Sequence, residues 1–423
     1  MKLDMKKLGA TVIWIGLASM CAAQTGAVAS ADQSSAPPQE AGATASQAAP
    51  AAPAAPPAPM ALTTPAITGP LSNLPPLVFD AGPVGKVAVN GMITGFGMWQ
   101  GNHVPGDNQT QASLSNGQIF LQKTDGWFQF YIQAGAYTTP ALAVPFLQTD
   151  KSVSDLYGPV PVAYLKLQAG KNTSFEIGSL PTLIGAEYTF TFENMNIERG
   201  LLWNQESAVS KGIQLNQTMG KFSASLSWND GYYSNRYNWL SGSLAYANGP
   251  HAISFVAGGN YGTTGYFSYA TPVQNTGSIY NVIYTYTKGS WIVQPYYQFN
   301  TVPSNAKIGI PVGAHANGGA ILLSYAFKHG FSLPVRWEYI GTSGSAAQNA
   351  VNLMFGPGSS ATSITVTPTF QYGGFFVRGD LSWVHAIDST PGFVFGRSGV
   401  NDNQPRAVAE IGFIFGNNIV EKK

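Results

Sequence analysis

From Lys86 to Phe415, the chain alternates apolar and polar residues over successive stretches of about ten residues. In residues 221–228, "KFSASLSW", three serines alternate with apolar side chains, and in residues 375–383, "FFVRGDLSW", the charges fall on the polar face. A period of two places neighbouring side chains on opposite faces of a β-strand. A transmembrane barrel requires strands of this kind, because one face of each strand meets lipid and the other faces the lumen.

The links between these stretches alternate between short and long. Outer-membrane barrels have short periplasmic turns and longer external loops, whereas a soluble β-sandwich has no reason to sort its connections in this way. The pattern predicts an all-β fold, an antiparallel transmembrane barrel of about 16 strands over residues 77–415. Short glycine-rich links occur near residues 124, 170, 219, 248, 288, 328 and 372, and long polar links cover 101–113, 138–159, 181–207, 230–238, 263–276, 302–316, 342–360 and 387–404.

The N-terminus has the three parts of a secretory signal peptide. Three lysines precede the apolar run 8–20, which is too short to span a bilayer, and small residues follow it. We expect a signal peptide over residues 1–31, with cleavage after Ala23, Ala29 or Ala31.

The next segment, residues 32–76, is of low complexity and rich in alanine and proline. It lacks the large apolar side chains of a core, so we expect a flexible periplasmic tether that prefers polyproline II. Residues 416–423 are predicted to form a short C-terminal tail.

The composition agrees with an outer-membrane protein. Only 10% of the residues are charged, whereas a soluble domain of this size is about one-quarter charged. The chain has 48 glycines, 20 tyrosines and 23 phenylalanines, and no stretch after the predicted leader is long and apolar enough for a membrane helix. An exported chain of this composition is predicted to lie in the bacterial outer membrane as a closed barrel.

Several classes of function are excluded by composition. Cys21, the only cysteine, lies in the predicted leader, which excludes disulfide scaffolds, thiol catalysis and cysteine metal sites in the mature chain. Without the leader the formal charge is about −1, so no global field favours nucleic acid. The five histidines lack the spacing of a metal site, and we expect neither a metal nor a cofactor.

Three segments resemble a known family. They are "GSLPTLIGAE" (178–187), "SLSWNDGYYSNRYN" (225–238) and "FVRGDLSW" (376–383). They are similar to segments of the putative β-barrel porin-2 family of bacterial outer-membrane proteins, and the similarity covers most of residues 86–415. The resemblance implies a pore in the outer membrane, but it implies no particular solute.

The third long link contains "AEYTFTFENMNIERG", residues 186–200, which concentrates charge in a chain that has little. Another strand here would make the strand number odd and break the alternation of turns and loops. We therefore expect residues 181–207 to fold into the lumen as a constriction, with aromatic side chains packed on the wall; the alternative is an extended lid outside the barrel. The residues predicted to line the passage are Glu187, Glu193, Glu198 and Arg199.

Further charges fall on the polar faces of the predicted strands. Two interpretations stay open: pairs between strands that satisfy one another in a wet lumen, or opposed charges that produce a transverse field for solutes. The predicted lumen-facing residues are Lys166, Glu176, Arg336, Glu338, Arg378, Asp380 and Glu410.

The predicted function is a porin, a passive diffusion channel for small hydrophilic solutes and not an enzyme. Its expected partners are outer-membrane lipid, the barrel-assembly machinery and, by resemblance to general porins, two further copies in a homotrimer. The alternatives are a substrate-specific channel for sugars or aromatic solutes and a non-conducting structural or adhesive barrel. A surface hydrolase built on His385 and Asp388 ranks last.

Overall fold

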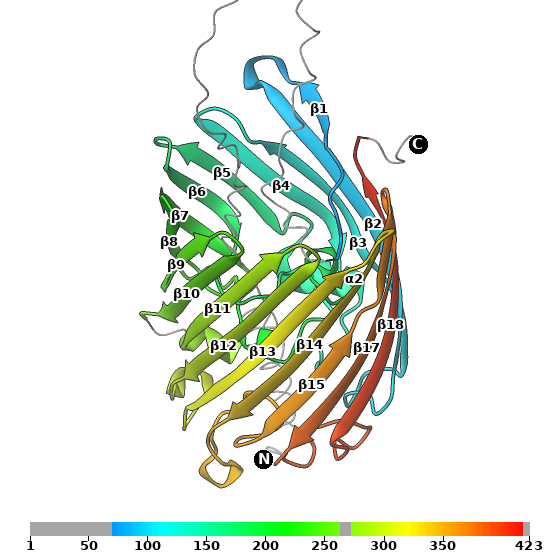
Figure 1. Cartoon of the computed structure of the whole chain (residues 1–423). Helices are drawn as coiled ribbons and strands as arrows, with labels where there is room; N and C mark the ends of the chain where they lie inside the picture. The colour runs from blue at the N-terminus through cyan, green and yellow to red at the C-terminus, as the bar shows by residue number, and fades with distance from the viewer. Residues whose placement is uncertain (1–69, 263–271, 418–423) are drawn as a thin grey trace, which may run out of the picture.

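The structure, a computed structural model, describes residues 70–262 and 272–417. Its strands form one antiparallel sheet that closes on itself into a barrel of sixteen wall strands (Figure 1). The predicted fold class, strand number and alternation of short turns with long loops are confirmed. Residues 1–69, 263–271 and 418–423 lie outside the described residues, and with them the predicted signal peptide, most of the predicted tether and most of the predicted tail.

The wall runs from β2 to β18. β15 and β16 share one position in it, because both pair with β14 on one side and β17 on the other. Pro368 lies in the break between them, and proline has no backbone N–H to donate to a neighbouring strand. The bounds are β2 Lys86–Gln100, β3 Thr110–Lys123, β4 Phe128–Tyr137, β5 Val162–Gln168, β6 Thr173–Pro181, β7 Val209–Met219, β8 Phe222–Asn229, β9 Trp239–Asn248, β10 His251–Asn260, β11 Ser278–Lys288, β12 Trp291–Val302, β13 Ala314–Ala326, β14 Phe331–Thr342, β15 Ser360–Val366, β16 Thr369–Tyr372, β17 Phe375–Ile387 and β18 Asn403–Phe415.

The barrel closes between its first and last wall strands. β18 pairs with β2 from Arg406 opposite Gln100 to Phe415 opposite Gly91. Closure pairs the edges that an open sheet would expose to lipid, where unpaired backbone groups are costly. The segment "EIGFIF", residues 410–415, lies in β18 and is the closing strand.

A hairpin extends the barrel at the end that carries the short turns. Its strand β1, Leu77–Asp80, pairs with the start of β2, and the 3-10 turn η1, Gly82–Val84, joins them. Figure 1 shows this hairpin beyond the other strands, at the same end of the barrel as the C-terminal end of β18.

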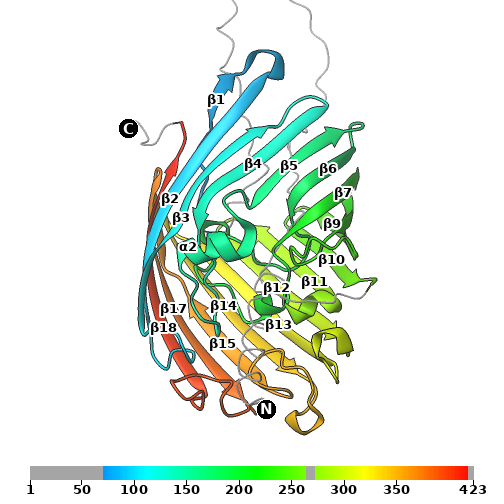
Figure 2. The same cartoon turned by 180° about the vertical axis from the view of Figure 1, so that it is seen from behind.

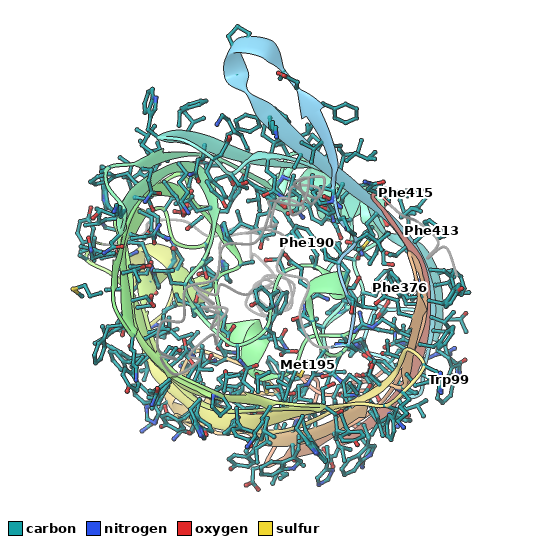
Figure 3. All side chains as sticks on the ribbon, turned by 45° about the horizontal axis from the view of Figure 1, so that its top comes forward. Trp99, Phe190, Met195, Phe376, Phe413 and Phe415 are labelled. Carbon is teal, nitrogen blue, oxygen red and sulfur yellow. The ribbon has the colours of Figure 1, made fainter. Side chains whose placement is uncertain are left out.

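Alternation along each strand separates the two faces of the wall. On β2, for example, Met92 and Phe96 are buried, whereas Ile93 and Trp99 are 49% and 45% exposed. Figure 3 shows Trp99 outside the ring of strands. The apolar outer face is the one that meets lipid.

Two of the long links place structure inside the barrel. The link between β4 and β5 contains the helix α2, Thr149–Ser152, and the π-helical turn η2, Val153–Tyr157; α2 contacts β3 and β4. Figure 2 shows α2 within the barrel. The link between β6 and β7 carries the 3-10 turns η3, Thr191–Glu193, and η4, Leu202–Gln205, and the remaining turns are η5 Val273–Thr276, η6 Ala306–Ile308 and η7 Ala346–Gln348. No helix of the described ranges is long and apolar enough to cross a membrane.

The last residues of the predicted tether differ from the expectation. Residues 70–76 do not extend away from the barrel: Leu71 is only 4% exposed and belongs to a cluster with Met92, Phe376 and Ile414, which point into the barrel. Burial of Leu71 removes apolar surface from water, which a free tether would leave exposed.

Arginine substitutions on the outer face of β17 test where the midplane of the bilayer lies. Leu381 lies at the centre of β17 on the outer face and is 60% exposed, so Leu381→Arg is expected to destabilise the barrel by about 2–4 kcal/mol in a bilayer. Phe375→Arg is the matched control, because Phe375 lies on the same face at the turn end of β17, where an arginine costs about 0–1 kcal/mol. Denaturant unfolding in phospholipid vesicles measures both. Equal losses of stability in the two variants would contradict a bilayer midplane at the centre of β17.

Candidate functional site

The link between β6 and β7 lies inside the barrel. We call residues 182–208 the inner loop; every one of them is buried. Figure 3 shows Phe190 and Met195 of this segment within the ring of strands. The inner loop contacts three different parts of the wall, each by a different kind of interaction.

The first contact is an ion-pair cluster on β14. Arg336 Nη1 lies 2.5 Å from Glu187 Oε1 and also donates to the Glu198 carbonyl oxygen at 2.7 Å. The neighbouring Glu338 accepts from the backbone N–H groups of Leu201 and Leu202, at 3.0 and 3.3 Å. Arg336 and Glu338 are two residues apart, so both point inward from the same strand, and each holds a different part of the inner loop.

Gly200 allows this close approach. A Cβ atom at position 200 would lie 2.0 Å from Glu338 Oε1, so any other residue would displace the carboxylate. The Gly200 N–H instead donates to Glu187 Oε2 at 2.8 Å.

A second set of charges on β17 and β18 holds the middle of the inner loop. Arg406 Nη1 lies 2.7 Å from Glu198 Oε1, and the Glu198 N–H donates to Asp380 Oδ2 at 2.8 Å. Arg378 donates to the carbonyl oxygens of Thr191, Asn194 and Met195, each at 2.9 Å.

Glu410 completes this set from β18. Its carboxylate accepts from the hydroxyls of Ser115 and Thr191, at 2.8 and 2.7 Å, and lies 3.5 Å from Arg378. A guanidinium offers five donors in a rigid fork, and one arginine can therefore bind both a carboxylate and backbone carbonyls.

The second contact is apolar. Leu183, Ile184, Leu201 and Leu202 form one buried cluster with inward side chains of β9 to β14, among them Trp239. Polar contacts flank this cluster: Gln298 donates to the Leu202 carbonyl oxygen at 2.9 Å, and Tyr232 donates to that of Gln205 at 2.7 Å. The apolar cluster therefore holds the start and end of the inner loop against the wall.

The third contact is aromatic, as predicted. The rings of Phe190 and Tyr137 are 5.2 Å apart and nearly perpendicular, and the rings of Phe192 and Phe120 are 5.7 Å apart. Tyr188 belongs to the same buried cluster. Aromatic pairs in these arrangements contribute about 0.5–1.5 kcal/mol beyond their area burial.

Arg199 holds the inner loop to itself and to the β4–β5 link. Its guanidinium donates to the carbonyl oxygens of Tyr188, Thr189 and Ile197 within the inner loop and to that of Pro140. The Arg199 backbone also exchanges hydrogen bonds with Pro140 and Leu142. The two links inside the barrel therefore form one packed unit.

The four charged residues of the predicted passage lie differently from the prediction. Glu187, Glu193, Glu198 and Arg199 are 2%, 5%, 0% and 0% exposed, and each interacts with other groups of the protein. They fasten the inner loop to the wall or to itself, because the wall that faces the acidic residues carries arginines.

Of the seven predicted lumen-facing residues, five fasten the inner loop and two do not. Lys166 and Glu176, on β5 and β6, pair at 3.5 Å, and their side chains are 28% and 14% exposed. They are the predicted residues that keep contact with solvent. Arg336, Glu338, Arg378, Asp380 and Glu410 point inward as expected, but they are buried beneath the inner loop.

Two residues of this site were missed from the sequence. Arg406 lies four positions before Glu410 on the same face of β18, so extending the alternation toward the N-terminus of that strand would have found it. Gln205 donates to the Leu353 carbonyl oxygen at 2.7 Å and accepts from Gln274 at 3.0 Å, and no pattern in the sequence indicates these partners.

The external loop after β8 borders the same region. Asp230 accepts from the backbone N–H groups of Lys211 and Asn235, at 2.7 and 2.9 Å. Burial raises the pKa of Asp230 above its ordinary value, and these hydrogen bonds oppose the shift.

The alternative hydrolase dyad is not assembled. His385 Nδ1 lies 3.1 Å from Asn403 Oδ1, and the His385 ring stacks on Trp383. Within residues 70–262 and 272–417, no group of three or more histidine, cysteine or acidic residues is placed to hold a metal ion.

Comparison with known sequences agrees with the barrel. The profile of a family described as putative beta-barrel porin-2, OmpL-like, matches residues 86–415. A search of curated protein sequences found no match.

Solved structures with the same fold include outer-membrane proteins. A Salmonella typhi OmpF in complex with daunomycin is similar with a TM-score of 0.53 and 12% identity, over 78% of this chain and 98% of that one. The outer membrane channel DcaP of Acinetobacter baumannii has a TM-score of 0.52 and 10% identity, over 78% and 97%. OmpT of Vibrio cholerae, described in a trimer form, has a TM-score of 0.50 and 10% identity, over 78% and 99%. At these identities the likeness establishes the fold alone.

Arg336→Gln tests how the inner loop is fastened. It leaves Glu187 and Glu338 buried without their cation, so the expected loss of stability is about 3–5 kcal/mol, together with tryptic cleavage after Arg199 in the folded barrel. Glu187→Gln combined with Arg336→Gln should recover part of the loss. Lys166→Gln is the control, with an expected loss of about 0–1 kcal/mol because that pair is partly exposed. An unchanged tryptic pattern in Arg336→Gln would contradict this fastening role.

Proposed function

The chain belongs to the putative beta-barrel porin-2, OmpL-like, family and is an outer-membrane porin channel, and on this basis we propose that it carries small hydrophilic solutes by passive diffusion, with the inner loop as its constriction. Family and fold indicate a channel rather than an enzyme. The observation that carries the constriction is the position of residues 182–208, which cross the interior and are held to the wall on several sides.

The inner wall away from the charged strands supports a hydrophilic route. Inward side chains of β5 to β8 near the short turns are polar and partly exposed, including Lys166, Glu176, Asn216 and Ser223. A hydrated polar lining lets solutes exchange their hydration shell for wall contacts, which passive diffusion of hydrophilic solutes needs.

The charge of the interior favours weak cation preference. Of the eleven residues predicted to face the passage, seven are acidic and four are basic, and Arg406 adds a fifth base. Because most of them pair beneath the inner loop, we expect Lys166 and Glu176 to act on permeating ions most directly.

Assembly is part of the proposal. We expect the barrel-assembly machinery to insert the chain and outer-membrane lipid to cover its apolar face. The Vibrio cholerae protein of the same fold is described in a trimer form, and we propose a homotrimer for this chain.

A second candidate is a barrel that conducts nothing. The observation that favours it is the burial of the whole inner loop, 182–208. A conductance measurement distinguishes the two candidates, because only the channel would carry current.

Planar-bilayer conductance tests the channel and its constriction together. The wild-type chain should carry current, and the variant with Glu187→Gln, Arg336→Gln, Glu198→Gln and Arg406→Gln should carry more, because it removes both partners of the two ion pairs that join the inner loop to the wall. The control removes the Lys166–Glu176 pair with two glutamines and leaves the inner loop fastened. No current from either protein would contradict the channel. Equal currents would contradict the constriction.

Ion selectivity tests the lining. Lys166→Glu should move the reversal potential in a salt gradient toward cation preference, and Glu176→Lys should move it toward anion preference, because both side chains keep solvent contact on the inner face. The two substitutions serve as each other's control. Unchanged reversal potentials in both would show that permeating ions do not pass this pair.

A further inference from the structure

The outer face of the wall carries a row of aromatic and basic side chains at the turn end of β10 to β13, strands that lie side by side (Figure 1). His251 begins β10 opposite Tyr286 of β11, and Lys288 follows Tyr286 by two residues on the same face. Trp291 of β12 lies opposite Lys288, and Tyr325 of β13 lies opposite Trp291. We call His251, Tyr284, Tyr286, Lys288, Trp291 and Tyr325 the outer patch.

Alternation places the outer patch on the face of the wall that meets lipid. On β11, Tyr280 and Val282 are 41% and 42% exposed, whereas Asn281 and Ile283 between and after them are buried. Continued to the end of the strand, the same period turns both tyrosines of the patch and its lysine outward. Trp291 on the neighbouring strand is 45% exposed.

Contacts between rings hold the outer patch together. His251 Nδ1 lies 2.6 Å from the Tyr284 hydroxyl oxygen, and the centres of the His251 and Tyr286 rings are 5.2 Å apart. The Trp291 and Tyr325 rings are 4.6 Å apart. Tryptophan and tyrosine are enriched where a membrane meets water, because one end of each ring is apolar and the other is polar. The outer patch therefore lies at the level of the lipid headgroups on the side of the short turns.

The cations of this region have no acidic neighbours on the outer face. Residues 231–379 contain one acidic residue, Glu338, which is buried in the interior. Among the described residues, the side chains of Lys288 and Lys328, at two successive short turns, have no ion-pair partner. At the β3–β4 turn, by contrast, Lys123 pairs with an aspartate of its own turn at 2.5 Å. Unpaired lysines at one interface produce a local positive potential, which attracts anions.

The arrangement suits a phosphate that carries acyl chains. His251 and Lys288 are diagonal neighbours on adjacent strands, a separation of about 7–8 Å between their backbones. The stem of a lysine can lie along apolar surface while its ammonium group donates to a phosphate oxygen. Farther along the same strands, the outward side chains of Ile253 and Val282 are 47% and 42% exposed and provide an apolar surface for acyl chains.

We propose that the outer patch binds an anionic phospholipid of the periplasmic leaflet, with Lys288 on the phosphate, Lys328 beside the headgroup and Trp291 at the level of the glycerol. This rests on the proposed lipid cover of the outer face and names the class of lipid held at one place. Cell-wall polymer is another anionic partner on this side of the membrane. It would contact the tips of the turns, whereas the rings of the outer patch face sideways toward the bilayer.

Quenching by brominated lipid tests the site in the full-length chain. The protein is reconstituted in vesicles of phosphatidylglycerol and phosphatidylcholine, with bromine on the acyl chains of one lipid at a time. The signal of Trp291 is the difference between the chain and its Trp291→Phe variant. We expect a preference of about fivefold or more for phosphatidylglycerol at Trp291, and we expect Lys288→Gln with Lys328→Gln to bring the ratio close to one.

A matched control separates this site from the charge of the whole rim. Lys86→Gln with Lys123→Gln removes the same charge from the same end of the barrel, at β2 and β3, and should keep the preference at Trp291. An equal preference in the wild type and in Lys288→Gln with Lys328→Gln, or an equal loss in the control, would overturn the proposal.

Two further outcomes locate a failure. Absence of quenching of Trp291 by either lipid would contradict the lipid cover of the outer face itself. Sedimentation of the wild type with purified peptidoglycan, lost in Lys288→Gln with Lys328→Gln and accompanied by no lipid preference, would assign the two lysines to the cell wall and overturn the lipid site.

Discussion

The interior of this barrel depends on guanidinium groups that point inward from three strands of the wall, β14, β17 and β18. Arg336, Arg378 and Arg406 each bind the inner loop, through a carboxylate in two cases and through backbone carbonyls in the third. A guanidinium buried without partners would be very costly, and the inner loop that covers these three groups also supplies their partners. The position of the inner loop follows from this requirement.

Burial of these ion pairs adds little net stability, but it makes the position of the inner loop specific. Desolvation of two charges offsets much of their attraction, whereas loss of one partner leaves an uncompensated charge. We infer that the pairs determine where the inner loop lies, while the apolar cluster around Leu201 and the aromatic contacts of Phe190 supply most of the favourable burial. The proposed constriction depends on a loop held in one place.

Much of the wall could be predicted because each strand carries its own information. Alternation assigns Arg336 and Glu338 to the inner face without knowledge of any neighbour, and the register Lys166 opposite Glu176 follows from a short turn. The charged site was harder: Glu187 and Arg336 are 149 positions apart, and Glu198 and Arg406 are 208 apart. No local pattern shows which acid meets which base.

The sequence by itself determined that the chain is a closed barrel of the outer membrane, which face of each strand meets lipid, and which link is too long and too charged to be a strand. These follow from a period of two and from the absence of water in the bilayer core, and both act locally along the chain. Only the tertiary structure decided that the acidic residues of the inner loop fasten it to the wall and that residues 70–76 turn inward past the rim. Both depend on closure, which brings β18 beside β2 and places groups from distant parts of the sequence around one enclosed space.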